Sequence, residues 1–309
     1  MIVAIASGKG GTGKTTIATN LAISVPNSVY MDCDVEEPNG HLFLNPEISD
    51  IEIVDRLIPE INLQRCTYCG ECANICEYNA ITVLPNNVIV FNEMCHSCGV
   101  CAHFCPENAV IEIEKSIGIL RRGTIEPAGI TFIEGCLKIG EFIPGPLIKE
   151  VKRHIQSGKM NILDAPPGTA CPVVETIRDT DFCLLVTEPT PFGLNDLKLT
   201  VRVLRILGLP FGIVINKYKQ NVKLIEEYCQ EENLPILMKL AFDRRLAEAY
   251  SQGQPAVRIF PELKQQFQHL ADKIKAQIER VANNRCEENE WQRNISNNGK
   301  LSIKNLDRK

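Results

Sequence analysis

The sequence predicts an α/β fold, in which a mostly parallel sheet is covered by helices on both faces and interrupted by a small cysteine-rich insertion. Three observations lead to this prediction: apolar runs alternate with helical patterns, a glycine-rich turn follows the first run, and eight cysteines fall in one regular pattern. Apolar runs without polar alternation are typical of parallel strands buried on both faces. The expected strands are Ile2–Ala6, Val29–Met31, Ile162–Leu163, Phe182–Val186, Phe211–Ile215 and Ile236–Leu240.

Helical patterns lie between these strands, which is the order expected of a parallel sheet with crossover helices. A further segment, Pro261–Val281, has apolar residues every three or four positions, which favours a packed amphipathic helix over a membrane-binding one. Residues 284–309 are rich in Asn, Glu, Arg and Lys, and we expect a flexible polar tail there. The other expected helices are Thr15–Val25, Pro146–Ser157, Leu194–Leu207, Val222–Glu232 and Arg244–Ser251.

The composition of the 309-residue chain is that of an ordinary globular protein, with 44% hydrophobic and 23% charged residues. Its net charge of −5 argues against a general nucleic-acid binder, which normally carries a basic surplus. No apolar run approaches the roughly 20 residues needed to span a bilayer. Because the first residues already form a strand instead of a signal sequence, we expect a cytoplasmic protein.

Fourteen cysteines are the unusual feature of the composition. Eight of them form two runs of the pattern C-x₂-C-x₂-C-x₃-C, and the second run repeats the first at a constant offset of 29 residues. In a reducing compartment such a pattern indicates metal ligation by thiolates and not disulfide bonds. The first run is Cys66, Cys69, Cys72 and Cys76, and the second is Cys95, Cys98, Cys101 and Cys105.

The doubled run is typical of a bacterial ferredoxin-type module with two [4Fe–4S] clusters, in which the fourth cysteine of each run reaches the neighbouring cluster. Zinc is the main alternative, because C-x₂-C pairs also bind zinc, but eight cysteines in this doubled order favour iron. Acidic residues outnumber basic ones between positions 59 and 116, which suits a basic electron-transfer partner and equally a solvated surface. We assign Cys66, Cys69, Cys72 and Cys105 to one cluster, and Cys76, Cys95, Cys98 and Cys101 to the other.

A glycine-rich loop directly follows the first expected strand and opens the first expected helix. It satisfies G-x-x-x-x-G-K-[ST], a pattern in which backbone N–H groups and a helix N-terminus bind phosphate. We expect Lys14 to reach the β- and γ-phosphates of ATP, and the Thr15 hydroxyl to ligate Mg²⁺. A chance glycine-rich turn is disfavoured by the strand–loop–helix setting. The expected nucleotide-binding residues of the loop are Gly8, Lys9, Gly10, Gly11, Thr12, Gly13, Lys14, Thr15 and Thr16.

A second lysine in the loop, Lys9, makes the motif more specific. The sequence KGGTGKTT resembles the deviant Walker A motif of the family that contains MinD, ParA, Mrp and the nitrogenase iron protein. The resemblance implies that Lys9 crosses a dimer interface to the other subunit's nucleotide, and hence that ATP drives homodimerisation. It also implies that Asp34 is the switch I aspartate that orients the attacking water, and that Asp164 holds Mg²⁺ through water. Lys9, Lys14, Asp34 and Asp164 are thus the expected catalytic residues.

Two further residues are assigned through the same resemblance. Gly168, in the Pro-Gly turn after Asp164, is expected to sense the γ-phosphate through its N–H, as in switch II. Asn216 closes an expected strand and resembles the adenine-contacting Asn of the family, with a plain turn residue as the alternative. An Asp at a strand end is by itself most often a cap or turn residue, but the adjoining phosphate loop favours the functional interpretation of Asp34 and Asp164.

Cys136 and Cys171 stand at the same intervals from Asp164 as two cluster-ligating cysteines do in the nitrogenase iron protein. There the pair shares a cluster with the other subunit, so the resemblance implies a bridging cluster here. The local context differs, because the following helix is expected to begin several residues later, and ordinary packing thiols are the favoured alternative. The remaining cysteines are Cys33, Cys183, Cys229 and Cys286, and most of them are expected to be inert.

Taken together, residues 1–260 resemble the MinD-superfamily P-loop ATPases that contain an inserted ferredoxin domain. The expected organisation is an ATPase domain made of residues 1–58 and 117–283, with the insertion at 59–116. The preferred function is ATP-gated electron transfer to an unidentified redox partner, because a complete eight-thiolate site suits storing electrons. An Mrp-type carrier that delivers clusters to an accepting protein is the alternative, and a positioning ATPase of the MinD or ParA type is the second alternative.

Overall fold

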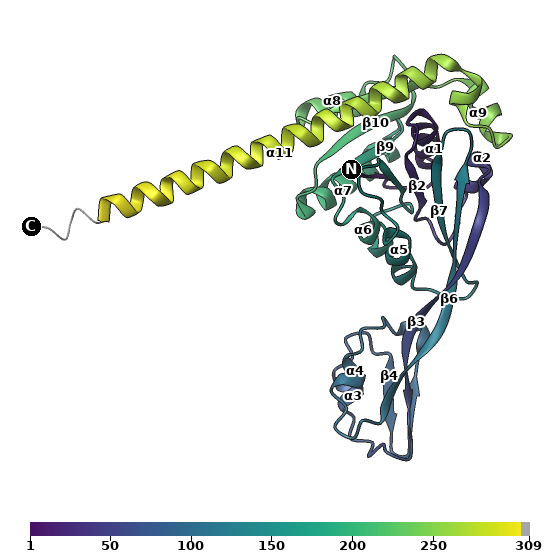
Figure 1. The fold of residues 1–309 in the computed structure, drawn as a ribbon, viewed down its shortest axis with the longest axis vertical. Coiled ribbons are helices and arrows are strands. Elements are labelled where there is room, and N and C mark those ends of the chain that lie inside the picture. The colour runs from purple at the N-terminus through teal and green to yellow at the C-terminus, as the bar shows by residue number, and fades with distance from the viewer. Residues whose placement is uncertain (304–309) are drawn as a thin grey trace, which may run out of the picture.

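A helix-covered sheet forms the body of the molecule, and a long ribbon carries a smaller lobe away from it (Figure 1). The computed structural model describes the backbone of residues 1–303 and the side chains of residues 1–283. Within that range the main sheet has nine strands in the order β11-β10-β9-β1-β8-β2-β7-β6-β3. The strands are β1 Ile2–Ala6, β2 Val29–Asp32, β3 Glu47–Ile61, β6 Val110–Ile125, β7 Ile130–Leu137, β8 Asn161–Asp164, β9 Phe182–Thr187, β10 Phe211–Tyr218 and β11 Ile236–Ala241.

All six strands expected from the sequence are present and pair in parallel, and β7 pairs in parallel with β2 as well. The mostly parallel α/β fold is therefore confirmed. Alternate residues of a strand face opposite sides of a sheet. In β1, Val3 and Ile5 belong to one buried cluster, whereas Ala4 and Ala6 belong to the other. Both faces are thus covered, which explains why the strands read as continuous apolar runs.

Helices pack on each face of the sheet. The first face is covered by α1, α10 and α11, and the second by α5, α6, α7 and α8. The expected helix Pro146–Ser157 ends earlier, at Lys152. No helix among the described residues is long and apolar enough to cross a membrane. The helices of the body are α1 Lys14–Ser24, α2 Gly40–Leu44, α5 Gly145–Lys152, α6 Cys171–Ile177, α7 Pro191–Leu207, α8 Leu224–Glu231, α9 Arg244–Ser251, α10 Ala256–Ile259 and α11 Pro261–Ile303.

The C-terminal segment continues α11. Residues 284–303, within the predicted flexible tail, are helical, and residues 304–309 lie outside the described part of the chain. Figure 1 shows this helix extending well past the sheet.

Three strands of the main sheet, β3, β6 and β7, were not expected from the sequence. They form the antiparallel side of the sheet, and β3 pairs with β6 along nearly its whole length. About half of this pair is a two-stranded ribbon beyond the end of β7, in which Ile111 and Ile113 are exposed beside Glu112 and Glu114. Such a ribbon has no continuous apolar run, but the alternation Ile111-Glu112-Ile113-Glu114 is a strand signal that the sequence prediction did not use.

The lobe at the end of the ribbon contains both cysteine runs, and β3 and β6 continue into it without a break. The 29-residue repeat of the sequence reappears in the backbone. Helices α3 and α4 each follow a glycine in the left-handed region, Gly70 with φ 85° and Gly99 with φ 71°. The elements of the lobe are α3 Glu71–Asn74, β4 Ile81–Leu84, β5 Asn87–Val90, the 3₁₀ helix Asn92–Met94 and α4 Val100–His103.

Candidate functional site

The glycine-rich loop joins β1 to α1 at the carboxyl edge of the sheet. Gly13 caps α1 with φ 92°, and a Cβ at this position would lie 2.2 Å from Nδ2 of Asn216. A Cβ at Gly8 would lie 2.5 Å from the carbonyl oxygen of Asp196. Glycine is therefore required at Gly13 by both conformation and packing, and at Gly8 by packing. The loop ends in the first turn of a helix, which is the setting that binds phosphate.

Asp164 ends β8 and is buried beside this loop. Its Oδ2 accepts a hydrogen bond of 3.0 Å from the Tyr30 hydroxyl, while its buried Oδ1 has no partner among the described residues. Burial raises the pKa of Asp164, and the Lys14 ammonium and the Thr15 hydroxyl partly offset this rise. A buried carboxylate oxygen left without a partner near Thr15 fits a site for Mg²⁺.

Asp34 lies just beyond β2, and β2 pairs with β8 so that Asp32 is opposite Asp164. The predicted Asp34 and Asp164 therefore come from neighbouring strand ends. Burial raises the pKa of Asp34 to about 7, with the Lys14 ammonium lowering it and the Asp164 carboxylate raising it further. A carboxyl group that titrates near neutral pH is suited to proton exchange with a reacting water.

Asp32 is a buried residue whose role the sequence analysis missed. Its Oδ1 accepts a hydrogen bond of 3.1 Å from the N–H of Asp34. Its Oδ2 accepts from the N–H groups of Asn39 and Gly40 at 3.2 and 2.9 Å. Asp32 thus fixes the loop that presents Asp34. The D-x-D spacing before a Pro-Asn-Gly turn is a signal that could have indicated such a capping carboxylate.

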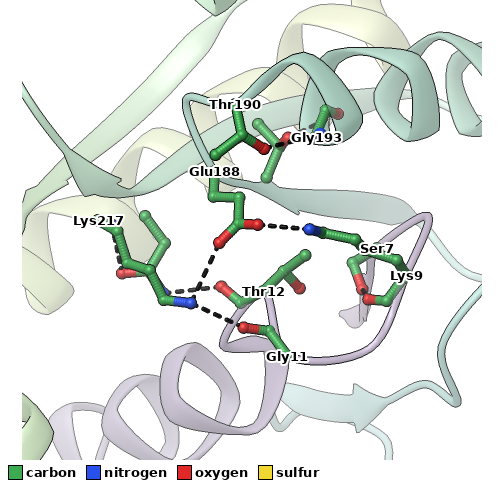
Figure 2. Close-up of polar contacts among 10 residues, drawn as sticks. Ser7, Lys9, Gly11, Thr12, Glu188, Thr190, Gly193 and Lys217 are labelled. Atoms are coloured by element: carbon green, nitrogen blue, oxygen red, sulfur yellow. Dashed lines mark hydrogen bonds and ion pairs between the residues drawn. The ribbon is translucent and has the colours of Figure 1, made fainter. Parts of the chain in front are cut away.

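Lys9 is held within its own chain by an ion pair (Figure 2). Its Nζ lies 2.5 Å from Oε1 of Glu188, whose Oε2 contacts Nζ of Lys217 at 3.1 Å. Lys217 also donates to the carbonyl oxygen of Gly11 at 2.9 Å. Burial acts to raise the pKa of Glu188, but the hydrogen bonds from both lysines outweigh it and lower that pKa. Glu188 and Lys217 were not predicted, because their pairing joins segments far apart in the sequence.

A short turn before α7 places Glu188 over the loop. Thr190 caps α7 by accepting a hydrogen bond of 3.0 Å from the N–H of Gly193. A Cβ at Gly193 would lie 2.3 Å from the carbonyl oxygen of Glu188, so only glycine allows this turn to close so tightly. Figure 2 shows Thr190, Gly193 and Glu188 together on one side of Lys9.

The other two predicted residues also contact the loop. The N–H of Gly168 donates to the carbonyl oxygen of Ser7 at 3.0 Å. Nδ2 of Asn216 donates to the carbonyl oxygen of Thr12 at 2.8 Å. The structure therefore brings both residues to the phosphate loop, while their contacts with a nucleotide stay predictions.

A cavity of about 290 Å³ opens beside the loop and the first turn of α1. Gly13, Thr16 and Asn216 are among its lining residues. The rest is mainly apolar and comes from the end of β11 and from helices that follow it. An apolar cavity next to a phosphate-binding loop is a suitable place for a nucleoside. The apolar lining that the sequence analysis did not assign includes Leu240, Phe242, Leu246, Tyr250, Leu263 and Phe267.

The eight cysteines of the lobe line two separate cavities, four in each. The fourth cysteine of each run joins the three of the other run, as the sequence pattern predicts. Among the described residues, no three His, Cys, Asp or Glu side chains are grouped for a single metal ion. A four-iron cube takes one thiolate per iron, so its four ligands lie farther apart than the ligands of a single metal ion. Cys66, Cys69, Cys72 and Cys105 line one cavity, and Cys76, Cys95, Cys98 and Cys101 line the other.

Backbone N–H groups donate to four of these sulfur atoms, and the contacts repeat at the 29-residue offset. Such N–H···S hydrogen bonds are among the features that set cluster potentials. They fit thiolates that ligate a cluster in each cavity. The bonds run from Tyr68 to Cys66, from Ser97 to Cys95 and from Ala80 to Cys76 at 3.4 Å each, and from Ala109 to Cys105 at 3.3 Å.

The other cysteines lie in the body. Cys136 is half-buried on β7, and Cys171 is exposed at the first position of α6, so a bridging cluster through them stays a prediction. Burial raises the pKa of Cys183 well above its usual value and that of Cys229 to about 11. Buried thiols of this kind are poor nucleophiles. The side chain of Cys286 lies outside the described residues.

The fold and the loop together define a P-loop nucleotide-binding protein. Residues 3–257 match the CobQ/CobB/MinD/ParA nucleotide binding domain, and the chain belongs to this family of P-loop ATPases. The match spans both sides of the lobe, so the nucleotide-binding sheet is one unit interrupted in sequence.

Individual proteins are similar to this chain over most of its length. An uncharacterized protein of Methanocaldococcus jannaschii is 38% identical over 227 residues, covering 72% of this chain and 79% of the relative. A protein of Aquifex aeolicus named iron-sulfur cluster carrier protein is 23% identical over 310 residues, covering 91% and 69%. Among solved structures, MinD of Pyrococcus horikoshii with Mg-ADP has a TM-score of 0.55 at 20% identity, covering 88% of this chain and 95% of that one. That likeness shows the shared fold.

Proposed function

We propose that this protein binds and hydrolyses ATP and that nucleotide binding controls electron transfer through two [4Fe–4S] clusters held in the lobe. One observation carries the proposal: two cavities, each lined by four cysteines, stand on a ribbon whose strands belong to the nucleotide-binding sheet. When bound, such clusters supply one-electron redox chemistry. The ferredoxin-type insertion at 59–116 is part of this proposal.

The nucleotide side of the proposal rests on residues at the carboxyl edge of the sheet. Lys14 and the loop N–H groups bind the phosphates, and Thr15 with the unpartnered Oδ1 of Asp164 holds Mg²⁺. Asp34 is placed by Asp32 to orient the attacking water. The apolar cavity beside Asn216 receives the nucleoside.

Homodimerisation would require Lys9 to leave Glu188. The ion pair is partly buried, with side-chain exposures of 32% for Lys9 and 13% for Glu188. Lys217 already neutralises Glu188 from the other side. Glu188 is therefore not left as an isolated buried charge when Lys9 turns towards a second subunit.

The direct test is a redox titration followed by EPR on anaerobically purified protein, with and without Mg²⁺ and a non-hydrolysable ATP analogue. We expect nucleotide to change the reduction equilibrium of a cluster about tenfold, which is 59 mV for a one-electron couple. Lys14→Ala is the control, because it removes phosphate binding and leaves the lobe intact. Identical potentials with and without nucleotide in the wild type would contradict nucleotide control.

A cluster carrier is the second candidate, favoured by the relatives named iron-sulfur cluster carrier protein, among them that of Pyrococcus abyssi at 22% identity over 276 residues. A carrier must release its cargo, whereas four thiolates per cavity favour retention. Incubation with an apo-ferredoxin separates the two functions. Transfer of clusters that ATP accelerates would favour the carrier, and retention through repeated reduction would favour electron transfer.

A further inference from the structure

One buried arginine connects the lobe to the body. Arg56 lies on β3, and its side chain is 2% exposed. Nη1 donates to the carbonyl oxygen of Cys95 at 2.5 Å, and Nη2 donates to that of Asn92 at 2.7 Å. Nη1 also contacts the Ser97 hydroxyl at 3.3 Å. Charge-assisted hydrogen bonds of this kind are stronger than neutral ones, so Arg56 fixes the loop that carries Cys95.

The counter-charge of Arg56 comes from the body. Glu141, in the segment between β7 and α5, lies 3.5 Å from Nη2 of Arg56, and its side chain is 8% exposed. Glu141 also pairs with Lys115 at 2.7 Å, and Lys115 is opposite Arg56 in the ribbon. A buried arginine needs such a partner, because a buried unpaired charge is costly. The position of Glu141 therefore affects both the loop of Cys95 and the charge beside it.

The segment that carries Glu141 is itself tied to the nucleotide site. Leu137, the last residue of β7, donates its N–H to the carbonyl oxygen of Val35 at 2.7 Å. Val35 is buried and directly follows Asp34. A movement of the Asp34 loop would thus be passed through the end of β7 to Glu141 and Arg56.

Among the described residues, no charged side chain connects the other cysteine cavity to the body in this way. Its equivalent loop lies 29 residues earlier and includes Asn62, Arg65 and Cys66. In the part of the chain that the structure describes, the hydrogen bonds within this loop come from backbone N–H groups, and Arg65 is exposed. The two halves of the repeat are therefore alike in backbone and different in their link to the body.

We propose that the cluster held by Cys76, Cys95, Cys98 and Cys101 is the one that responds to nucleotide, and that Arg56 and Glu141 are the positioning residues that transmit the response. The proposal rests on the proposed function and specifies which half of the lobe it uses. Potentials of iron–sulfur clusters depend on nearby charge and on hydrogen bonds. A shift of Glu141 relative to Arg56 changes both for this cluster and leaves the other unchanged.

The test is a redox titration in which the two clusters are distinguished. Cys69→Ser and Cys98→Ser each replace one exposed ligand, one per cavity, and so assign the EPR signals. We expect the ATP analogue to shift the equilibrium of the Cys98 cluster about tenfold, which is 59 mV. In Glu141→Gln this shift falls below about twofold, while ATP affinity is retained. The matched control, Arg65→Gln, removes an exposed arginine beside the other run and keeps the full shift.

The outcomes separate this proposal from the function on which it rests. If nucleotide shifts neither cluster, the proposed function fails, and this inference fails with it. If nucleotide shifts the Cys69 cluster, or if Glu141→Gln keeps the full shift, nucleotide control stands and the role of Arg56 and Glu141 is overturned. If nucleotide shifts the Cys98 cluster in the wild type and in Arg65→Gln but not in Glu141→Gln, both the proposed function and the role of Arg56 and Glu141 are supported.

A second measurement covers the case in which Glu141→Gln loses its clusters. Hydrogen exchange of iron-loaded wild-type protein compares residues 92–97 with residues 63–68, their equivalents in the repeat. We expect Mg·ATP to change the exchange rate of residues 92–97 at least about three times as much as that of residues 63–68. Equal changes in the two peptides would overturn the proposal.

Discussion

The body and the lobe are stabilised by different means. Two large clusters of buried apolar side chains lie on the two faces of the main sheet. In the lobe, the corresponding cluster of buried residues comprises only Ile58, Ala80 and Cys95. Burial of apolar surface is the main force that folds the body. On the proposed function, a lobe with so small a core depends on the clusters that its cysteines hold, as small metal-binding domains generally depend on their metal.

The largest expected effect follows from this difference. Anaerobic removal of iron from the holoprotein should unfold the lobe and leave the body folded. We expect amide protection between residues 62 and 109 to fall at least about a hundredfold, equivalent to about 2.7 kcal/mol, while β1, β8 and β9 keep theirs. Hydrogen exchange followed by mass spectrometry measures both regions in one sample. Unchanged protection in the lobe would show that its polypeptide folds without metal.

A substitution confined to the body should destabilise the body and leave the lobe unaffected. Gly13→Ala places a side chain at φ 92° and 2.2 Å from Asn216, which costs about 1–3 kcal/mol of the free energy of unfolding. Urea unfolding measures this cost, and iron content should remain that of the wild type. Gly10→Ala is the matched control, because nothing lies within 4 Å of a Cβ there. Equal stability of the two variants would mean that the loop is less tightly packed than the structure shows.

The features predicted best from the sequence are those whose residues lie close together in the chain. Thiolates that surround a four-iron cube must come from closely spaced cysteines, and the two sets assigned from the sequence are those that line the two cavities. The phosphate loop is equally local, and the continuous apolar strands result from burial on both faces.

Features that depend on distant contacts were missed. The Lys9–Glu188 pair joins residues 179 positions apart, and no local pattern specifies it. The ribbon formed by β3 and β6 is held by cross-strand pairing with little burial, so its residues lack the signal of a buried strand. Arg56 resembles any charged residue of an exposed strand until the fold places the Cys95 loop against it.

The smallest expected effect concerns the pH dependence of stability in the body. The pKa of Asp34 is about 7 in the folded chain, because burial raises it, and about 3.9 when unfolded. Between these pH values the Asp34 carboxyl binds more protons in the folded state than in the unfolded state. This group therefore makes the free energy of unfolding fall as pH rises from about 4 to about 7. Asp34→Asn removes that fall and should gain stability relative to the wild type across this window.

Urea unfolding of nucleotide-free protein at several pH values between 5 and 8 measures the difference. Glu231→Gln, which removes an exposed carboxylate, is the control. A wild-type and an Asp34→Asn curve that run parallel with pH would contradict the raised pKa of Asp34.

The central claim is that each cysteine cavity of the lobe holds one four-iron cluster. Iron and acid-labile sulfide, measured per chain in anaerobically purified protein, test it most directly. We expect about eight iron and about eight sulfide ions per chain, falling to about four of each when Cys66 and Cys69 are both replaced by serine. Two zinc ions per chain without labile sulfide would contradict it.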